Sequence, residues 1–256
     1  MPLKRKQSVL SCLITRSVDD NARLKKELGS PKWRVISWPS YRYQALPVSA
    51  KTAKAVRNIA LFDWIVLTST RAVDAFFVVY FETHRDVQAL KGIKFAAVGA
   101  QTAAALKSYG VRVNLIPQDN SVAGLIAAKP FQSSTQLKIL FPCARDARPD
   151  FVKAFHNKHD IVVAKLYCKK LIQHSAKDRE ALLQKKIDWV LFYSPSAVDA
   201  FLKGVGVARG KKWLSSIKIA TIGKTTAAHL QTLSLNVVVV ADKAETKSLI
   251  QKILVR

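Results

Sequence analysis

The chain carries one sequence pattern twice. Residues 63–77 read DWIVLTSTRAVDAFF and residues 188–202 read DWVLFYSPSAVDAFL, an offset of 188 − 63 = 125 positions. A second pair follows in the same order, FAAVGAQTAAALKSYGVRV at 95–113 and IATIGKTTAAHLQTLSLNV at 219–237. Ordered self-similarity of this length is typical of a duplicated structural unit. The sequence therefore predicts two similar lobes.

Each copy shows the alternation of an α/β fold. Short apolar, β-branched runs alternate with segments rich in Ala, Leu and Lys, at the spacing of βαβ units. Strands that are apolar throughout are typical of a parallel sheet covered by helices on both faces. We therefore predict an α/β protein in which each lobe is a parallel β-sheet flanked by helices. The strands are expected at residues 9–15, 64–68, 95–98, 111–116, 138–141, 161–166, 189–193, 219–222 and 235–240.

Several turn residues indicate where helices begin and end. Ser121 is placed to cap a helix that Pro130 ends, and Gly110 falls where a left-handed residue would stop the preceding helix. A weaker third repeat, SVAGLI from Ser121 and ETKSLI from Glu245, predicts a last helix in each lobe.

Length and composition fit a folded cytoplasmic protein. The 256 residues, 49% of them hydrophobic, suffice for two compact domains. No apolar run approaches the roughly 20 residues that span a bilayer. We interpret the apolar stretch 9–14 as a buried strand rather than a secretory leader, because charged residues follow it directly. Three cysteines without a CxxC pair indicate reduced thiols.

The formal net charge of +25 predicts attraction to anions. The Lys and Arg residues are spread over the chain as singles and pairs, and no zinc finger, aromatic RNA-binding motif or basic heptad helix accompanies them. Dedicated nucleic-acid binding is therefore not expected, although a basic nucleic-acid-binding α/β protein stays open as an alternative.

Each repeated strand ends in a turn of small polar residues, and a helix starts directly after it. These turns lie at Ser69-Thr70, Gly99 to Thr102, Ser194 to Ser196 and Gly223 to Thr226. Hydroxyls and free amides at helix N-termini favour anions, and ligands of parallel sheets bind beyond the carboxyl ends of the strands. The alternative is that Ser69, Thr102, Ser194 and Thr226 only cap helices. Two lobes facing each other across these turns would form a cleft suited to carboxylates or phosphates.

The sequence lacks the familiar motifs of nucleophilic serines, nucleotide binding and metal binding. It contains no GxSxG, no Walker A loop and no GxGxxG. His156 and His159 lie three residues apart, but no further ligand completes a metal site. We expect neither a metal nor a cofactor.

An ordered set of motifs covers nearly the whole chain. It comprises TSTRAV at 68–73, VGAQTA at 98–103, LFPCARDARPDF at 140–151, KLYCK around Tyr167, YSPSAVDAF at 193–201 and IGKTTAAHL at 222–230. In this set the chain resembles the uroporphyrinogen-III synthase family. The resemblance implies two α/β lobes joined by a two-stranded linker. Their expected limits are 1–38 with 170–256 for one lobe, 46–164 for the other, and 38–46 and 164–170 for the linkers.

The resemblance also implies an activity, that of a cyclising lyase in tetrapyrrole (haem) biosynthesis. Without a cofactor, the family converts hydroxymethylbilane to uroporphyrinogen III and inverts the last ring through a spiro intermediate. The expected partner is this small-molecule polycarboxylate, and a monomer is expected because one chain supplies both lobes. Transient contact with the preceding pathway enzyme stays open. So does a catalytically degenerate protein that binds tetrapyrroles or other anions.

Site residues follow from the matched motifs. Tyr167 resembles the family tyrosine that assists departure of the hydroxyl, and its alternative role is to pack the linker. The hydroxyl and glycine positions expected to bind substrate carboxylates are Ser69, Gly99, Thr102, Ser194, Ser196, Gly223 and Thr226. The basic residues expected to pair with carboxylates are Arg16, Arg71, Arg148 and Lys218.

Three positions depart from the family pattern. Thr70 and Lys224 stand where many members have proline, and neither change removes a hydrogen-bond donor. ETKSLI lacks the glycine of its counterpart, which argues against the last helix start as a binding element.

Overall fold

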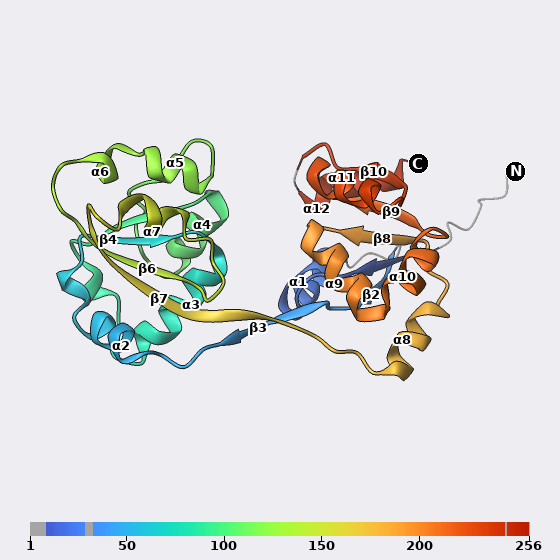
Figure 1. Cartoon of the computed structure of the whole chain (residues 1–256), viewed down its shortest axis with the longest axis horizontal. Coiled ribbons are helices and arrows are strands. Elements are labelled where there is room, and N and C mark those ends of the chain that lie inside the picture. The colour runs from blue at the N-terminus through green and yellow to red at the C-terminus, as the bar shows by residue number, and fades with distance from the viewer. Residues whose placement is uncertain (1–8, 29–32, 244, 256) are drawn as a thin grey trace, which may run out of the picture. The chain divides into compact units, whose positions relative to one another are not determined.

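The computed structural model describes residues 9–28, 33–243 and 245–255. Contacts within the chain divide it into two compact units. Unit 1 comprises residues 1–42 and 170–256, and unit 2 comprises residues 43–169. Each is built on a five-stranded sheet (Figure 1).

Unit 1 has the strand order β10-β9-β8-β1-β2, and the neighbouring strands are parallel. The strands are β1 (Leu10–Ile14), β2 (Trp33–Ser37), β8 (Trp189–Phe192), β9 (Lys218–Thr221) and β10 (Val237–Val240). The helices are α1 (Val18–Glu27), α8 (Ala176–Leu183), α9 (Pro195–Val205), α10 (Val207–Leu214), α11 (Lys224–Thr232) and α12 (Thr246–Leu254).

Unit 2 has the order β3-β7-β6-β4-β5, in which β7, β6, β4 and β5 are parallel neighbours. The strands are β3 (Tyr41–Ala45), β4 (Trp64–Leu67), β5 (Lys94–Ala97), β6 (Lys138–Ala144) and β7 (Asp160–Leu171). The helices are α2 (Ala50–Arg57), α3 (Thr70–Phe81), α4 (Ala100–Ser108), α5 (Val122–Ala127), α6 (Lys129–Gln132) and α7 (Asp150–Phe155), with 3-10 turns η1 (Ile59–Leu61) and η2 (Gln88–Leu90). Two mostly parallel sheets flanked by helices confirm the predicted fold class.

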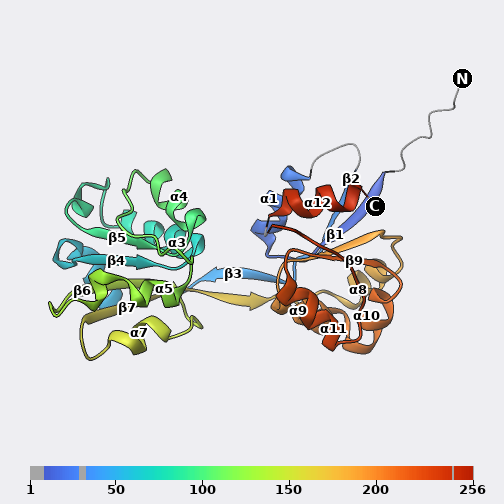
Figure 2. The ribbon, with the colours of Figure 1, turned by 90° about the horizontal axis from the view of Figure 1, so that it is seen from above.

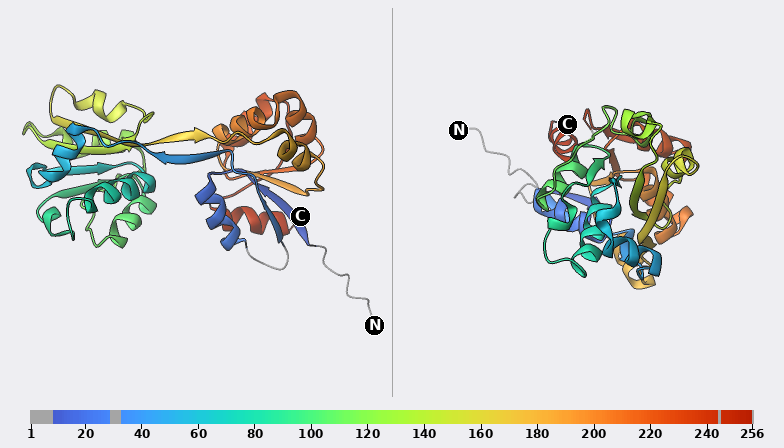
Figure 3. Two further views of the ribbon diagram at one scale, coloured as in Figure 1. Left: turned by 90° about the horizontal axis from the view of Figure 1, so that it is seen from below. Right: turned by 90° about the vertical axis from the view of Figure 1, so that its left-hand side faces the viewer.

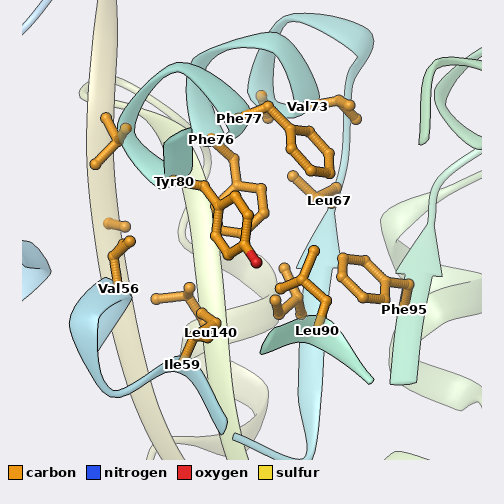
Figure 4. Close-up of a cluster of buried hydrophobic side chains, with 14 of the residues drawn as sticks. Val56, Ile59, Leu67, Val73, Phe76, Phe77, Tyr80, Leu90, Phe95 and Leu140 are labelled. Carbon is orange, nitrogen blue, oxygen red and sulfur yellow. The ribbon is translucent and has the colours of Figure 1, made fainter. Parts of the chain in front are cut away.

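Both faces of each sheet are buried under helices (Figure 2). In unit 2, Ile65 and Leu67 of β4 pack under α2, α3 and α4, whereas Trp64 and Val66 pack under α5, α6 and α7. Figure 4 shows the first of these cores, in which Phe76, Phe77 and Tyr80 of α3 lie over the sheet. This double coverage explains why the strands read as continuous apolar runs.

The chain passes between the units in β3 and β7, which lie side by side (Figure 3). The Leu46 amide donates to the Leu166 carbonyl at 2.9 Å, and the Ile172 amide donates to the Ser40 carbonyl at 3.1 Å. These two bonds mean that the segments run antiparallel. The limits predicted for the lobes and linkers from the sequence stay predictions.

Three local expectations were wrong. Residues 111–116 form no strand and make a single bridge, Ala96 to Leu115, at the edge of unit 2. The strand β2 was missed. Pro130 does not end the helix capped by Ser121, because that helix stops at Ala127 and Pro130 lies in the first turn of α6. Proline is tolerated there since the first helical amides have no intrahelical partner.

The aspartate of the repeated Asp-Trp pair accepts hydrogen bonds at the amino edge of each sheet. In unit 1 the Asp188 carboxylate accepts hydrogen bonds from the amide and the hydroxyl of Ser11 in β1, each at 2.7 Å. In unit 2 the Asp63 carboxylate accepts one from the Lys138 amide of β6, also at 2.7 Å. Each aspartate thus holds the start of the neighbouring central strand, so this part of the repeat is structural.

We expect Asp188→Asn to lower the free energy of unfolding by about 1 kcal/mol at neutral pH, because solvent at this partly exposed site reduces the roughly 1.5–3 kcal/mol of a hydrogen bond to a charged group. Partial burial opposes ionisation of Asp188, but the Ser11 bonds and the nearby Lys186 and Lys218 outweigh it, so its pKa lies below 3.8. The carboxylate's contribution is therefore complete above pH 3.8 and is lost as the pH falls below it. Urea unfolding at pH 7 and pH 3 measures this.

The exposed Asp150, which makes no hydrogen bond to a described residue through its side chain, provides the control. Asp150→Asn should change stability little at either pH. A penalty for Asp188→Asn that is equal at both pH values would contradict the role of the charge.

Candidate functional site

The carboxyl edge of unit 2 begins with Ser69, which follows β4. Ser69 is the N-cap of α3, and its Oγ accepts a hydrogen bond from the Ala72 amide at 3.1 Å. The same oxygen lies 3.1 Å from the Tyr167 hydroxyl. Ser69 is therefore a cap, as its alternative interpretation held, and is also hydrogen-bonded to the predicted catalytic tyrosine.

A bulge in β7 places Tyr167 against Ser69. Val162 and Ala164 pack on the α3 face of the sheet and Val163 packs on the other, so regular alternation would put Leu166 on the α3 face and Tyr167 on the opposite one. The register with β6 shifts there, since Cys143 pairs with Lys165 and the next residue pairs with Tyr167. Both Leu166 and Tyr167 consequently lie in the α3-side core.

The Tyr167 ring is 8% exposed. Burial raises the pKa of its phenol above 10, and the hydrogen bond with Ser69 and the nearby Arg71 partly oppose that rise. The phenol therefore stays protonated through neutral pH. It can donate a hydrogen bond, while Ser69 and Arg71 favour the oxygen as negative charge develops on it.

Arg71 and Tyr43 complete this cluster. The Arg71 guanidinium in the first turn of α3 lies 4.5 Å from the centre of the Tyr43 ring. The Tyr43 and Tyr167 rings meet edge to face, with centroids 5.8 Å apart. Tyr43 is not among the predicted site residues, because the sequence places it only in a linker. The spacing of motifs contains no signal for it.

The carboxyl edge of unit 1 carries a related arrangement. Ser194 caps α9, its Oγ accepting from the Ala197 amide at 3.2 Å and lying 3.1 Å from Ser196 Oγ. Arg16, which follows β1, lies 4.9 Å above the Tyr193 ring and 3.3 Å from an Asp20 carboxylate oxygen. Part of its charge is therefore already compensated. Burial raises the pKa of Tyr193 to about 12, against opposing effects of Thr246 and Arg16.

The glycine turns differ from the serine turns. Gly99 and Gly223, not the threonines, are the N-caps of α4 and α11. Thr102 and Thr226 lie in the first helical turns and are each 3% exposed. Neither threonine hydroxyl makes a hydrogen bond to a residue that the structure describes. Neither oxygen is among the buried side-chain atoms without a partner, so each stays open to water or to a ligand, and an anion at the helix N-terminus could accept a hydrogen bond from it.

Two predicted basic residues are placed differently. Arg148 is exposed in the segment after β6, at the carboxyl edge of unit 2, and makes no ion pair with a described residue. Lys218 is not brought to a carboxyl edge. It begins β9 at the amino edge, where its Nζ lies 5.4 Å from the Trp189 ring, as that of Lys94 lies 5.8 Å from Trp64. The structure therefore does not bring Lys218 together with the polar turns at the carboxyl edge.

The last helix of each unit also differs. Ser121 caps α5 through its hydroxyl, whereas Glu245, at the start of α12, makes no side-chain capping bond. The missing glycine thus coincides with a helix start that lacks a side-chain cap.

Neither His156 nor His159 lies in a group of described residues that could hold a metal ion. His159, 3% exposed, accepts from the Leu137 amide at 3.3 Å, and its Nε2 lies 2.9 Å from the Phe131 carbonyl. It does not share a helix face with His156, which ends α7. Over the described ranges, no His, Cys, Asp or Glu side chains form a group of three that could hold a metal ion, and no helix is long and apolar enough to cross a membrane.

Comparisons with known proteins agree with the motifs. The family model described as uroporphyrinogen-III synthase HemD matches residues 22–251. The porphyrin biosynthesis protein HemD of Ruminiclostridium josui is 27% identical over 246 residues, which cover 94% of this chain but 47% of that protein, so the chain spans about half of its length. The uroporphyrinogen-III synthase of Chlorobaculum parvum is 22% identical and covers 90% of this chain and 92% of its own.

A solved structure shares the fold. The uroporphyrinogen-III synthetase of Helicobacter pylori aligns with a TM-score of 0.64 at 17% identity, over 96% of this chain and 99% of its own.

Proposed function

Since the chain belongs to the uroporphyrinogen-III synthase family, we propose that it converts hydroxymethylbilane to uroporphyrinogen III without a cofactor. One observation carries the proposal: a buried phenol, Tyr167, is hydrogen-bonded to the helix cap Ser69 at the carboxyl edge of a parallel sheet. That edge is where ligands of such sheets bind.

The reaction requires the protein to bind the substrate in one conformation and to supply one proton donor. Tyr167 transfers its proton to the hydroxyl of the bilane, which leaves as water and generates an azafulvene cation and a tyrosinate; the tyrosinate takes back the proton that is released when the ring closes. The last ring attacks through its substituted carbon, giving the spiro intermediate, and fragmentation with reclosure then inverts that ring. The protein favours this course by holding one conformation of a flexible chain.

Substrate binding is assigned to the turns of both units. The eight carboxylates of the substrate suit helix N-termini flanked by hydroxyls, and a net charge of +25 raises the local concentration of a polyanion. Ser69, Thr102, Ser194, Ser196 and Thr226 act as donors, and Arg16, Arg71 and Arg148 pair with carboxylates. The three buried, unpaired cysteines suit the reducing cytoplasm, where we place the protein.

An isomer analysis tests the reaction. Freshly prepared hydroxymethylbilane is incubated with the protein, the products are oxidised, and the type I and type III isomers are resolved. We expect an excess of type III over the spontaneous type I product. Type I alone, with tight binding of the bilane, would favour the degenerate binding protein. Micromolar DNA or RNA binding that falls steeply with salt would favour the nucleic-acid-binding alternative.

Gly223 offers a test of close substrate approach. Its backbone is extended (φ −167°), and an added Cβ would meet nothing within 4 Å, so neither conformation nor packing requires glycine there. We expect Gly223→Ala to leave stability within about 0.5 kcal/mol of wild type. It should raise KM about tenfold because the methyl group obstructs a carboxylate approaching the α11 amides, a typical reason for glycine at a ligand site.

Gly99 provides a contrast in stability alone, since its φ of +84° favours glycine for conformational reasons. Gly99→Ala should lower the free energy of unfolding by about 1–2 kcal/mol. An unchanged KM for Gly223→Ala would remove the α11 N-terminus from the substrate site.

A further inference from the structure

We propose that Tyr43 is a positioning residue for Tyr167, its ring fixing the orientation of the phenol on one side while carrying the Arg71 guanidinium on another. The inference rests on the proposed function and deepens it. It follows from three contacts within unit 2: Arg71 over Tyr43 at 4.5 Å, Tyr43 edge to face with Tyr167 at 5.8 Å, and Tyr167 to Ser69 at 3.1 Å.

Strand pairing brings the two tyrosines together. Because β3 runs antiparallel to β7, with Leu46 bonded to Leu166 and Ser40 to Ile172, Tyr43 lies diagonally across from Tyr167. Diagonal neighbours lie about 7–8 Å apart, within reach of aromatic side chains. Tyr43 packs on the same α3-side core to which the bulge turns Tyr167.

Each contact of Tyr43 has a physical consequence for the reacting hydroxyl. An edge-to-face pair favours one mutual orientation of two rings, so Tyr43 limits rotation of Tyr167 away from Ser69. A guanidinium over an aromatic face is held by the ring quadrupole, so Tyr43 also keeps the Arg71 cation beside the site where phenoxide charge develops. Tyr43 shields the phenol from water as well. None of these effects needs the Tyr43 hydroxyl.

The test compares Tyr43→Leu, which removes the ring, with Tyr43→Phe, which keeps it. We expect Tyr43→Leu to lower kcat about tenfold with KM changed less than about twofold, since a misplaced catalytic group affects the chemical step. Tyr43→Phe should restore kcat to within about twofold of wild type. A Phe variant as slow as the Leu variant would overturn the proposal, because the hydroxyl and not the ring would then matter.

A double-mutant cycle separates positioning from general destabilisation. In a Tyr167→Phe background there is no hydroxyl left to position, so adding Tyr43→Leu should lower kcat by less than about twofold. The same tenfold loss in both backgrounds would show that Tyr43 acts independently of Tyr167, and would overturn the proposal. Tyr109→Leu is the control for ring removal: Tyr109 stacks on Phe77 in the same core at 4.0 Å, and its loss should reduce stability without this coupling.

A titration keeps this inference distinct from the proposed function. In protein labelled with ζ-carbon-13 tyrosine, the Tyr167 signal is assigned by its absence in Tyr167→Phe. Burial is the main cause that raises the Tyr167 pKa, and the hydrogen bond with Ser69 and the charge of Arg71 lower it. Removing the Tyr43 ring lets water reach the phenol and so weakens the effect of burial. Tyr43→Leu should therefore move the pKa down toward 10. An unchanged titration would overturn the positioning role even where type III product forms. Absence of type III product would overturn the proposed function alone.

Discussion

Tyr167→Phe is expected to lower the rate of type III formation about a hundredfold while the fold stays intact, because a positioned proton or hydrogen-bond donor contributes roughly 10²–10⁴-fold. The substitution removes only the hydroxyl oxygen. The Ser69 Oγ that bonds to it still caps α3 through the Ala72 amide, so no buried polar group loses all its partners. The rate of type III formation at saturating substrate and the thermal unfolding midpoint measure the two parts of this expectation.

The role of Tyr167 as a donor also predicts how the activity depends on pH. The phenol donates only while protonated, and burial holds its pKa above 10, so wild-type activity should persist through neutral pH and fall as the pH rises through that pKa. Tyr109→Phe, which removes a hydroxyl 3.5 Å from Asp74 elsewhere in unit 2, is the matched control and should keep full activity. An unaltered rate in Tyr167→Phe would remove this residue from the mechanism and leave packing as its role.

The fold class could be predicted because it depends on patterns that the chain repeats. Strands buried on both faces are continuously apolar, and the repeats align β4 with β8 and β5 with β9. The segment 111–116 was predicted wrongly as a strand because it contains apolar, β-branched residues like those of its counterpart β10. In unit 2 the equivalent residues make only the Leu115 bridge, since β-propensity needs a partner strand to be satisfied.

The site could be predicted only in part, for physical reasons. Turns at the carboxyl ends of parallel strands share one edge, so the serine and glycine turns could be grouped from sequence. The bulge that turns Tyr167 toward Ser69 depends on the register between β6 and β7, which alternation cannot show. The position of Lys218 at the start of β9 could not be predicted, because charge alone does not tell which end of a strand a residue occupies. Tyr43 depends on a pairing between β3 and β7, segments far apart in the sequence.

Valine substitutions at Thr102 and at Thr226 are expected to weaken substrate binding without lowering the stability of the protein. Thr102 and Thr226 are each 3% exposed, and neither hydroxyl bonds to a described residue. Neither is among the buried atoms without a partner, so water can bond to each; replacing such a hydroxyl with a methyl group of the same shape should leave the unfolding temperature of Thr102→Val and Thr226→Val nearly unchanged. A hydrogen bond to a carboxylate contributes about 1.5–3 kcal/mol, so each variant should raise KM at least about tenfold.

Combining the two substitutions shows whether the two units act on one substrate molecule. Thr102 lies in unit 2 and Thr226 in unit 1, so the two substitutions fall in different folding units. If both hydroxyls bind carboxylates of the same bilane, the losses multiply and the double variant should raise KM about a hundredfold, with kcat less affected. Thr225→Val, at the exposed neighbour of Thr226, is the matched control and should leave KM nearly unchanged. A double variant no weaker in binding than either single variant would contradict joint binding, because one helix N-terminus would then hold no part of the substrate.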